Sequence, residues 1–465
     1  MMTYSCAGLF SGPGKQGVNR APSTSSSIRA FGSSARAVAS TPLGSLTIRK
    51  WTLDNGLSLI TVPDTGARSV SYLTMFRVGS RNENASAGET GLAHLFEHLM
   101  FTGVSAGGRP ADFDQQIEEV GGSSNAMTTH DFTSYIDELP PAALDRAIQL
   151  EAHRMVNLEL GEKRLSTERE VVVQERLGSV EDSVDGTLDE MVWGQAFKAH
   201  PYRWPIIGRM TDIRSVTRDR VLAFYRRHYA PNHAVIVVAG AFEESAALQA
   251  IEAAYRGLRA DSPEPDAPAP VPERAPRSEV RARIQRPVPA DRFVMGYPAP
   301  GLGDPERATY DVIDQLLLGG PSSRLHRLLV VERELASSVN GDVAPTRDPG
   351  LFCLWIQMTR GHEAGRAEEL IVQEMERLAT ESVDAGELTA AKNRLETEFW
   401  SELGSSRGRA EALGHFEVTT GDYQNLIERS RAYDQVTASD VRRVAGAFLA
   451  PGARSVVTAS PNNAP

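Results

Sequence analysis

This sequence of 465 residues has only two cysteines, Cys6 and Cys353, which lie far apart along the chain. A disulfide framework is therefore excluded, and cysteine usage leaves the redox compartment open. Apolar runs long enough for a membrane span are also absent, so we expect a soluble protein without one. Basic residues are outnumbered, and the formal net charge of −11 argues against nucleic acid as a partner while suiting basic peptides.

Acidic residues are missing from the start of the chain, where the first is Asp54 and residues 1–46 are rich in Ser, Gly, Ala and Arg. Such a segment buries too little apolar surface to order itself, so we predict a disordered tail. Its composition is that of a mitochondrial transit peptide without the amphipathic stripe, and it lacks the apolar region of a secretory signal. A bacterial-type, cytoplasmic protein is favoured over a periplasmic or mitochondrial one. Whether the tail is a targeting segment or a misassigned start stays open.

Length and patterning indicate more than one domain. With 41% hydrophobic residues the chain can bury more than one core. Prolines interleaved with Ala, Glu and Asp predict a stiff, extended linker over residues 259–280. The expected domains are residues 47–258 and 281–465.

The segments on both sides of this linker mix strand and helix patterns, which indicates the α+β class. Strands are predicted at 57–62, 69–77, 133–139, 234–239, 293–297 and 351–358, and helices at 144–157, 217–227, 363–379 and 385–403.

The two halves look like copies of one unit. At an offset of 220 residues, Val221 to Pro231 aligns with Val441 to Pro451, and an apolar run follows each segment. Each copy is thus predicted to end as a helix, an Ala-Pro turn and a strand.

The most informative motif interrupts an apolar helix at residues 91–101 with His94, Glu97 and His98. Positions i and i+4 share a helix face, so the two imidazoles can bind one ion, while Glu97 is free to act on its water. This H-x-x-E-H order, the inverse of H-E-x-x-H, predicts a zinc hydrolase. The alternative, two satisfied core histidines, would bury Glu97 without a cation nearby.

A catalytic zinc usually takes three protein ligands and keeps one position for water, so another ligand must come from elsewhere. The strongest candidate segment is residues 166–176, where Glu168 and Glu175 lie seven residues apart on one predicted helix face. Two carboxylates therefore point the same way.

At this point the sequence resembles peptidase family M16, the pitrilysin and mitochondrial processing peptidase family. Its third zinc ligand is a Glu about 77 residues beyond the second His, and that spacing counted from His98 reaches Glu175. The resemblance implies one zinc ion per chain on His94, His98 and Glu175, with Glu97 as general base. It also implies that Glu168 orients a ligating imidazole, for which a solvated helix-face charge is the alternative.

Further stretches that resemble the family lie at residues 121–135 and 200–208, so the resemblance spans most of residues 47–240. It implies two homologous αβ domains that form a half-clamshell. The stretch from Ser123 to Thr129 would be a sheet edge near the zinc that docks an extended peptide, with Asn125 and Ala126 as substrate-binding positions. The alternative is an ordinary turn and strand that begin at a glycine.

The second half departs from the first. At the same offset, Asp314, Leu317 and Leu318 stand where the zinc motif would be, so we expect no metal site there. Many family members also carry an Arg and a Tyr in this half that reach the zinc site across the chamber, and Val330 and Ser337 occupy those places. A second M16-like chain is therefore expected, and a heterodimer more than a homodimer.

The function implied is a zinc-dependent endopeptidase that hydrolyses extended or unfolded peptides. The first alternative is a catalytically silent structural or assembly subunit, but such relatives usually lose zinc ligands. The second is a structural zinc site, which would require four protein ligands and no free Glu beside them.

Overall fold

The computed structural model describes residues 35–102, 104–106, 109–111, 113–158, 160–260, 273, 279–449 and 451–462. Residues 1–34 of the predicted tail and most of the predicted linker lie outside this range. The predicted end of the tail at residue 46 is wrong, because Arg36–Leu43 forms strand β1 and pairs with β2 (Leu46–Thr52). This pairing satisfies the backbone of a segment whose side chains alternate between exposed and half-buried.

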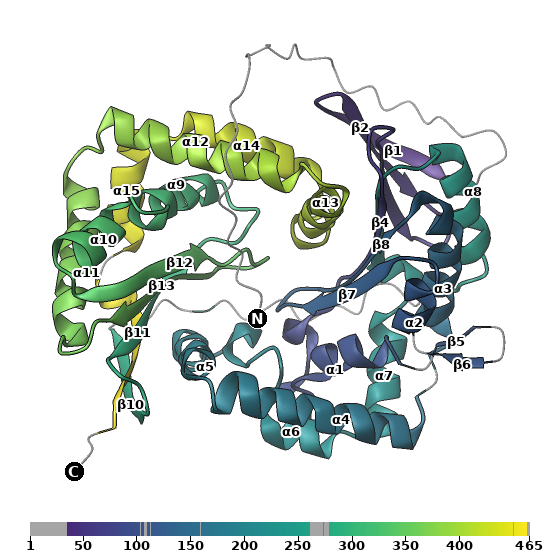
Figure 1. The fold of residues 1–465 in the computed structure, drawn as a ribbon, viewed down its shortest axis with the longest axis horizontal. Helices are drawn as coiled ribbons and strands as arrows, with labels where there is room; N and C mark the ends of the chain where they lie inside the picture. The colour runs from purple at the N-terminus through teal and green to yellow at the C-terminus, as the bar shows by residue number, and fades with distance from the viewer. Residues whose placement is uncertain are drawn as a thin grey trace.

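The first half (Figure 1) holds a seven-stranded sheet with helices around it. Its remaining strands are β3 (Ser58–Pro63), β4 (Val70–Phe76), β5 (Val104–Ala106), β6 (Arg109–Ala111), β7 (Ser123–Thr128), β8 (Thr133–Leu139) and β9 (Ala234–Gly240). Its helices are α1 (Leu92–Leu99), α2 (Phe113–Glu118), α3 (Leu144–Val156), α4 (Glu162–Arg176), α5 (Val184–Ala196), α6 (Met210–Ser215), α7 (Arg218–His228) and α8 (Glu244–Tyr255). Strands β5 and β6 form a separate hairpin.

The second half holds a five-stranded sheet. Its strands are β10 (Val280–Arg286), β11 (Arg292–Ala299), β12 (Ala336–Val343), β13 (Gly350–Met358) and β14 (Ser455–Pro461). Its helices are α9 (Arg307–Leu318), α10 (Arg324–His326), α11 (Ala364–Thr380), α12 (Ala385–Glu402), α13 (Ser406–Thr420), α14 (Gln424–Gln435) and α15 (Ala438–Phe448).

The duplicated α+β architecture is confirmed by strand order. The order β3-β9-β4-β8-β7 in the first sheet recurs as β10-β14-β11-β13-β12 in the second. In each copy the first pair is parallel and the other three are antiparallel. The predicted ending also recurs, since α7, a turn at Pro231–His233 and β9 match α15, a turn at Pro451–Ala453 and β14.

Each half donates one helix to the sheet of the other half. Helix α13 packs on β4 and β9 of the first sheet, and α5 packs on β11 and β14 of the second. Gly414 of α13 allows this close approach, because a Cβ there would lie 2.5 Å from Met75 Sδ. The two halves therefore share hydrophobic cores, and the expected boundary between them separates sequence segments rather than independent folding units.

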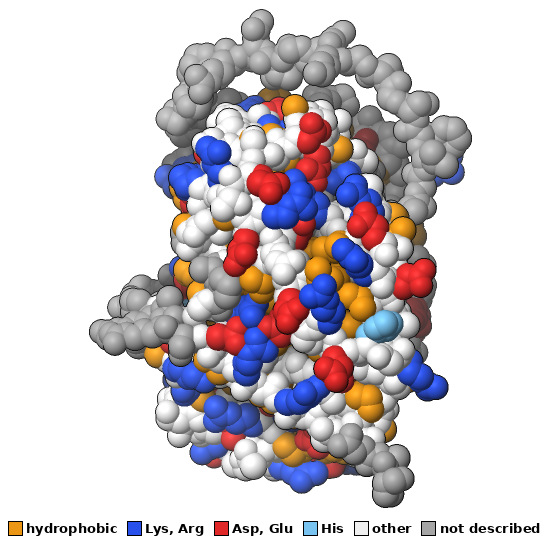
Figure 2. All heavy atoms as spheres, turned by 90° about the vertical axis from the view of Figure 1, so that its left-hand side faces the viewer, with side chains coloured by type: hydrophobic (Ala, Val, Ile, Leu, Met, Phe, Trp, Pro, Cys, Tyr) orange, Lys and Arg blue, Asp and Glu red, His pale blue; other side chains and the backbone are white. Residues whose placement is uncertain are grey.

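The outer face of the second half (Figure 2) carries Lys and Arg intermixed with Asp and Glu. Charged residues of the second half pair with one another, as in Arg443 with Glu306 at 2.9 Å and Arg366 with Glu369 at 2.9 Å. The net negative charge is therefore not gathered into one acidic patch on this face.

A buried charge cluster lies between the first sheet and α3. Arg154, only 1% exposed, donates to Glu151 and lies 3.8 Å from the ring centroid of Phe113. Asp137 of β8 is fully buried beside this pair. Burial and then the charge of Glu151 raise the pKa of Asp137 well above its usual value, more than Arg154 lowers it. The folded chain therefore binds a proton at Asp137 more tightly than the unfolded chain does.

We expect Asp137→Asn to stabilise the protein at alkaline pH relative to the parent. A group whose pKa is higher in the folded than in the unfolded chain contributes stability at pH values below its unfolded pKa, which is near 4 for Asp. This stability is lost as pH rises through the folded pKa, at about 1.4 kcal/mol per pKa unit of difference. The advantage of the variant should therefore shrink towards pH 4. Urea unfolding between pH 5 and 9 measures it, with exposed Asp145→Asn as control. A difference between variant and parent that is independent of pH would contradict this assignment.

Candidate metal centre

Helix α1 begins at a constrained point. Gly91 has φ of +90°, and a Cβ there would lie 2.6 Å from the carbonyl oxygen of Ile207, so only glycine fits. The carboxylate of buried Glu83 accepts hydrogen bonds from the backbone N–H groups of Gly91 and Ala93, both at 2.9 Å. These bonds satisfy donors that the first helical turn leaves free, and they fix where α1 starts.

The two faces of α1 have different roles. Leu92, Ala93, Leu95, Phe96 and Leu99 are buried in the core of the first half. The ring of Phe96 stacks on that of Tyr229, with centroids 4.8 Å apart. This packing turns the His94 and His98 imidazoles towards α4 and Glu97 towards Thr128 of the sheet.

Helix α4 brings Glu175 to the two imidazoles. Its carboxylate oxygens lie 3.6 Å from His94 Nε2 and 3.3 Å from His98 Nε2. Tetrahedral zinc with bonds of about 2.0–2.2 Å would place its ligand atoms roughly 3.3–3.6 Å apart. Two imidazoles and one carboxylate also match the donors that zinc prefers. Within the described part of the chain, His94, His98 and Glu175 form the group of possible metal ligands that lie close to one another.

The protonation of this group is uneven. Burial lowers the pKa of His94 to about 4. Burial also disfavours the charged form of His98, but hydrogen bonding and charge from Glu168 and Glu175 outweigh it and raise the pKa to about 9. The interaction with His98 in turn lowers the pKa of Glu175. At neutral pH without metal the group therefore holds one proton on His98, which an arriving cation would have to displace.

Glu168 contacts the imidazole of His98 from the side away from Glu175. One of its oxygens is 3.7 Å from His98 Nδ1, on the side of the ring opposite to Glu175. Its side chain is only 14% exposed, whereas that of Glu175 is 42% exposed. This placement differs from that of a freely solvated helix-face charge.

The predicted sheet edge near the centre is confirmed. Strand β7 is the last strand of the first sheet, paired on one side with β8. Asn125 is exposed and its side-chain oxygen accepts from the N–H of Ala126 at 2.9 Å. At the end of the strand, the Thr128 hydroxyl donates to Glu97 Oε2 at 2.6 Å. Burial raises the pKa of Glu97, and this hydrogen bond opposes the increase.

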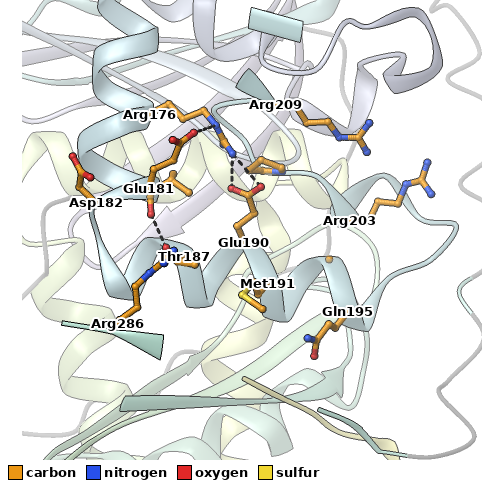
Figure 3. Close-up of a pocket in the computed structure, with 13 residues that line it drawn as sticks. Arg176, Glu181, Asp182, Thr187, Glu190, Met191, Gln195, Arg203, Arg209 and Arg286 are labelled. Atoms are coloured by element: carbon orange, nitrogen blue, oxygen red, sulfur yellow. Dashed lines mark hydrogen bonds and ion pairs between the residues drawn. The ribbon is translucent and has the colours of Figure 1, made fainter. Parts of the chain in front are cut away.

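Arg176, the residue after Glu175, holds the end of α4 from behind. Its guanidinium donates to the carbonyl of Gly208 at 2.8 Å and to Glu190 of α5 at 2.9 Å (Figure 3). Gly208 in turn packs on Gly91, where a Cβ would lie 2.5 Å from the Gly91 Cα. The arginine thus links the helix of Glu175 to the start of the helix of His94 and His98. A single Arg at the end of a helix carries no sequence pattern, so this link could not be predicted.

The hollow that Arg176 borders has a volume of about 720 Å³ and a mixed lining. Its other charged residues are Glu181, Asp182, Glu190, Arg203, Arg209 and Arg286. Glu181 lies 3.7 Å from Arg176, and nearby Asp185 pairs with Arg292 at 3.2 Å. Glu181 and Asp185 are therefore partly neutralised within the chain.

Two other sequence features lie elsewhere. Asp314, Leu317 and Leu318 are on α9, the counterpart of α1 in the second copy. Residues 103–107 spell Gly-Val-Ser-Ala-Gly, the pattern of a serine-hydrolase elbow, which requires a strand–turn–helix. Ser105 instead lies inside β5, opposite Pro110 of the hairpin. As for membranes, none of the described helices combines the length and apolarity of a spanning segment.

A duplicated α+β unit, with an H-x-x-E-H helix and a distant Glu in its first copy, is the architecture of an M16-type chain. Comparison with family models agrees. "Insulinase (Peptidase family M16)" matches residues 59–209, and "Peptidase M16 inactive domain" matches residues 215–395. The chain belongs to peptidase family M16.

Individual proteins show the same relationship over most of the chain. "Zinc protease PqqE" of Helicobacter pylori is 29% identical, with 86% of this chain and 89% of that protein covered. "Probable mitochondrial-processing peptidase subunit beta, mitochondrial" of Arabidopsis thaliana is 26% identical, with 86% and 76% covered. The crystal structure of a protease from Helicobacter pylori superposes with a TM-score of 0.84 at 28% identity, covering 89% of this chain and 99% of that one.

Proposed function

We propose that this chain is a zinc-dependent endopeptidase with one zinc ion held by His94, His98 and Glu175. The observation that carries the proposal is the convergence of these three side chains beside Glu97, which is not itself one of the group. The name of the Helicobacter relative, a zinc protease, supports the same metal.

Bound zinc would lower the pKa of a coordinated water towards neutrality and polarise the carbonyl of the scissile bond. Glu97 would accept the proton of that water and return it to the leaving amine. Glu168 would fix the ring of His98 from the side opposite the metal. Partial burial keeps the affinity of Glu97 for a proton high, which suits a group that must both take and give one.

The substrate class we propose is an extended or unfolded peptide. An edge strand offers unpaired backbone groups to a further strand, and β7 ends directly at Glu97. Asn125 and Ala126 would contact the peptide backbone there. Since Asn125 already accepts from the Ala126 N–H, its side chain would turn aside when a peptide pairs with that group.

A catalytically silent assembly subunit is the competing function. The description "inactive domain" attaches to the model that matches residues 215–395, and His94, His98 and Glu175 all lie outside that range. A structural zinc site would need a fourth protein ligand. It would also give Glu97 no role. Hydrolysis by the purified protein decides between these functions.

We propose further that the working enzyme pairs with a second M16-like chain. Ser337 is exposed on the edge strand β12 and Val330 packs against the core of the second half, so neither offers a cation to the substrate. An Arg and a Tyr from a partner would stabilise negative charge that develops on the substrate carbonyl oxygen.

The experiment measures cleavage of an unstructured peptide library and zinc content, for this chain alone and with a second M16 chain of the same organism. One such donor can be worth on the order of 10²–10³ in kcat, so addition of the partner should raise the rate at least tenfold. The mass in solution should correspond to a heterodimer. Full turnover by a monomer, or by a homodimer that no partner improves, would refute the pairing. Zinc-loaded chains that cleave nothing in any combination would refute the enzyme.

A further inference from the structure

We propose that Thr128 is a positioning residue that sets the orientation of Glu97. The inference rests on the proposed function. Thr128 is the last residue of β7, and its hydroxyl donates to Glu97 Oε2 at 2.6 Å, a short bond of the kind made to an ionised carboxylate. The Thr128 backbone also lowers the pKa of this carboxyl, against the effect of burial. Glu97 is thus held by the hydroxyl of the residue at the end of the strand.

The register of β7 explains why the backbone of Thr128 is not used by β8. The N–H of Thr129 donates to the carbonyl of Phe132 and closes the hairpin with β8. Because backbone groups alternate along an antiparallel pair, those of Met127 and Asn125 also turn towards β8, while those of Thr128 and Ala126 turn to the free edge. The Asn125 bond to the Ala126 N–H agrees with this register. The free edge of the strand therefore faces α1 at Thr128.

These contacts matter because Glu97 is otherwise a flexible side chain on a short helix. Its neighbours on α1, His94 and His98, contact Glu175, whereas Glu97 accepts a hydrogen bond from the Thr128 hydroxyl. A base must be held within a few tenths of an ångström of its productive position to transfer a proton efficiently. The strand thus supplies an orientation that the helix alone does not.

The same contact couples substrate docking to the base. A peptide that pairs with the free edge of β7 can use the outward groups at Ser124 and Ala126, whereas at Thr128 the carboxylate of Glu97 already lies against the strand. Pairing would therefore end next to the base, and one strand would set both the register of the peptide and the place of the carboxylate.

The test compares Thr128→Val, which removes the hydroxyl at nearly constant volume, with Thr128→Ser, which keeps it. We expect Val to lower kcat by about 10–100-fold with KM within about twofold, and Ser to restore the rate to within about threefold of the parent. Zinc affinity should be unchanged in both. Thr167→Val, which removes an exposed hydroxyl from α4, is the matched control and should match the parent.

A second readout does not depend on turnover. Affinity for a phosphinic peptide analogue of the transition state should fall in parallel with kcat/KM across the series, because such analogues report contacts made in the transition state. Affinity for the substrate peptide, measured in a Glu97→Gln background, should not change when Thr128→Val is added.

Three results would overturn the inference. Loss of substrate-peptide affinity in the double variant would mean that Thr128 acts in docking, and loss of zinc would mean that it acts on the ligands. Unchanged kcat in Thr128→Val with an active parent would refute positioning while leaving the proposed function intact. A parent that binds zinc but hydrolyses no peptide would refute the proposed function itself.

Discussion

Glu97→Gln should abolish peptide hydrolysis while the protein keeps its zinc. The amide cannot accept a proton, so general-base assistance worth about 10²–10⁴-fold in rate is lost. His94, His98 and Glu175 all survive in this variant, and Gln can still accept the Thr128 hydrogen bond that Glu97 now receives at 2.6 Å. The measurements are kcat/KM on an unstructured peptide and zinc content after exhaustive dialysis.

Glu170→Gln provides the matched control, since Glu170 is an exposed glutamate on α4 and differs from Glu168 and Glu175 in its direction. It should retain the activity and the zinc of the parent. An activity of Glu97→Gln within a few-fold of the parent would show that another group takes the proton. Activity lost together with zinc would show that Glu97 supports the metal rather than the reaction.

Much of the fold could be predicted because its elements carry local patterns. The strand at 133–139 matches β8, and the helix at 385–403 matches α12 to within one residue. The segments that were missed lack such patterns. Strand β1 has Arg, Ser, Thr and small residues in a sheet edge that buries little apolar area. It forms because β2 supplies a partner for its backbone, which no local property of residues 36–43 indicates.

The sequence also did not predict that α5 and α13 each pack on the sheet of the other half. Each helix contacts a strand that lies more than 100 residues away along the chain, α5 with β14 and α13 with β9. Gly414 permits the contact, but a glycine inside a helix indicates equally well a weak helix or a close neighbour. Only the tertiary structure distinguishes these possibilities.

For the candidate site, the spacing of residues predicted which side chains converge but not what holds them. Helical periodicity placed His94 with His98, and Glu168 with Glu175, on one face of each helix. That Glu175 meets the two histidines was implied by the family resemblance. The supports come from segments without a motif: Glu83 at the start of α1, Arg176 behind α4, and Thr128 at the end of β7. Thr128 falls within the stretch predicted as a sheet edge, so its place was indicated although its contact with Glu97 was not.

The two glutamates of α4 should differ sharply in what they do for the metal. Glu175→Gln should remove most of the zinc, because it replaces the anionic ligand that lies 3.3 Å from His98 Nε2 and 3.6 Å from His94 Nε2. Glu168→Gln should weaken binding by only about 10–100-fold, since Glu168 touches the far nitrogen of one ring. Competition with a chromogenic chelator measures both affinities.

The affinity for zinc should also depend on pH, and differently in the parent and in the two variants. In the parent, the pKa of His98 is raised to about 9, so zinc must displace its proton at neutral pH and should bind more tightly as pH rises from 7 towards 9. Both variants remove a carboxylate that holds this proton, so His98 loses it at lower pH and the slope of affinity against pH should flatten in each. If Glu175→Gln and Glu168→Gln keep equal amounts of zinc, the third ligand is another residue, and Glu175 only balances the charge of His98.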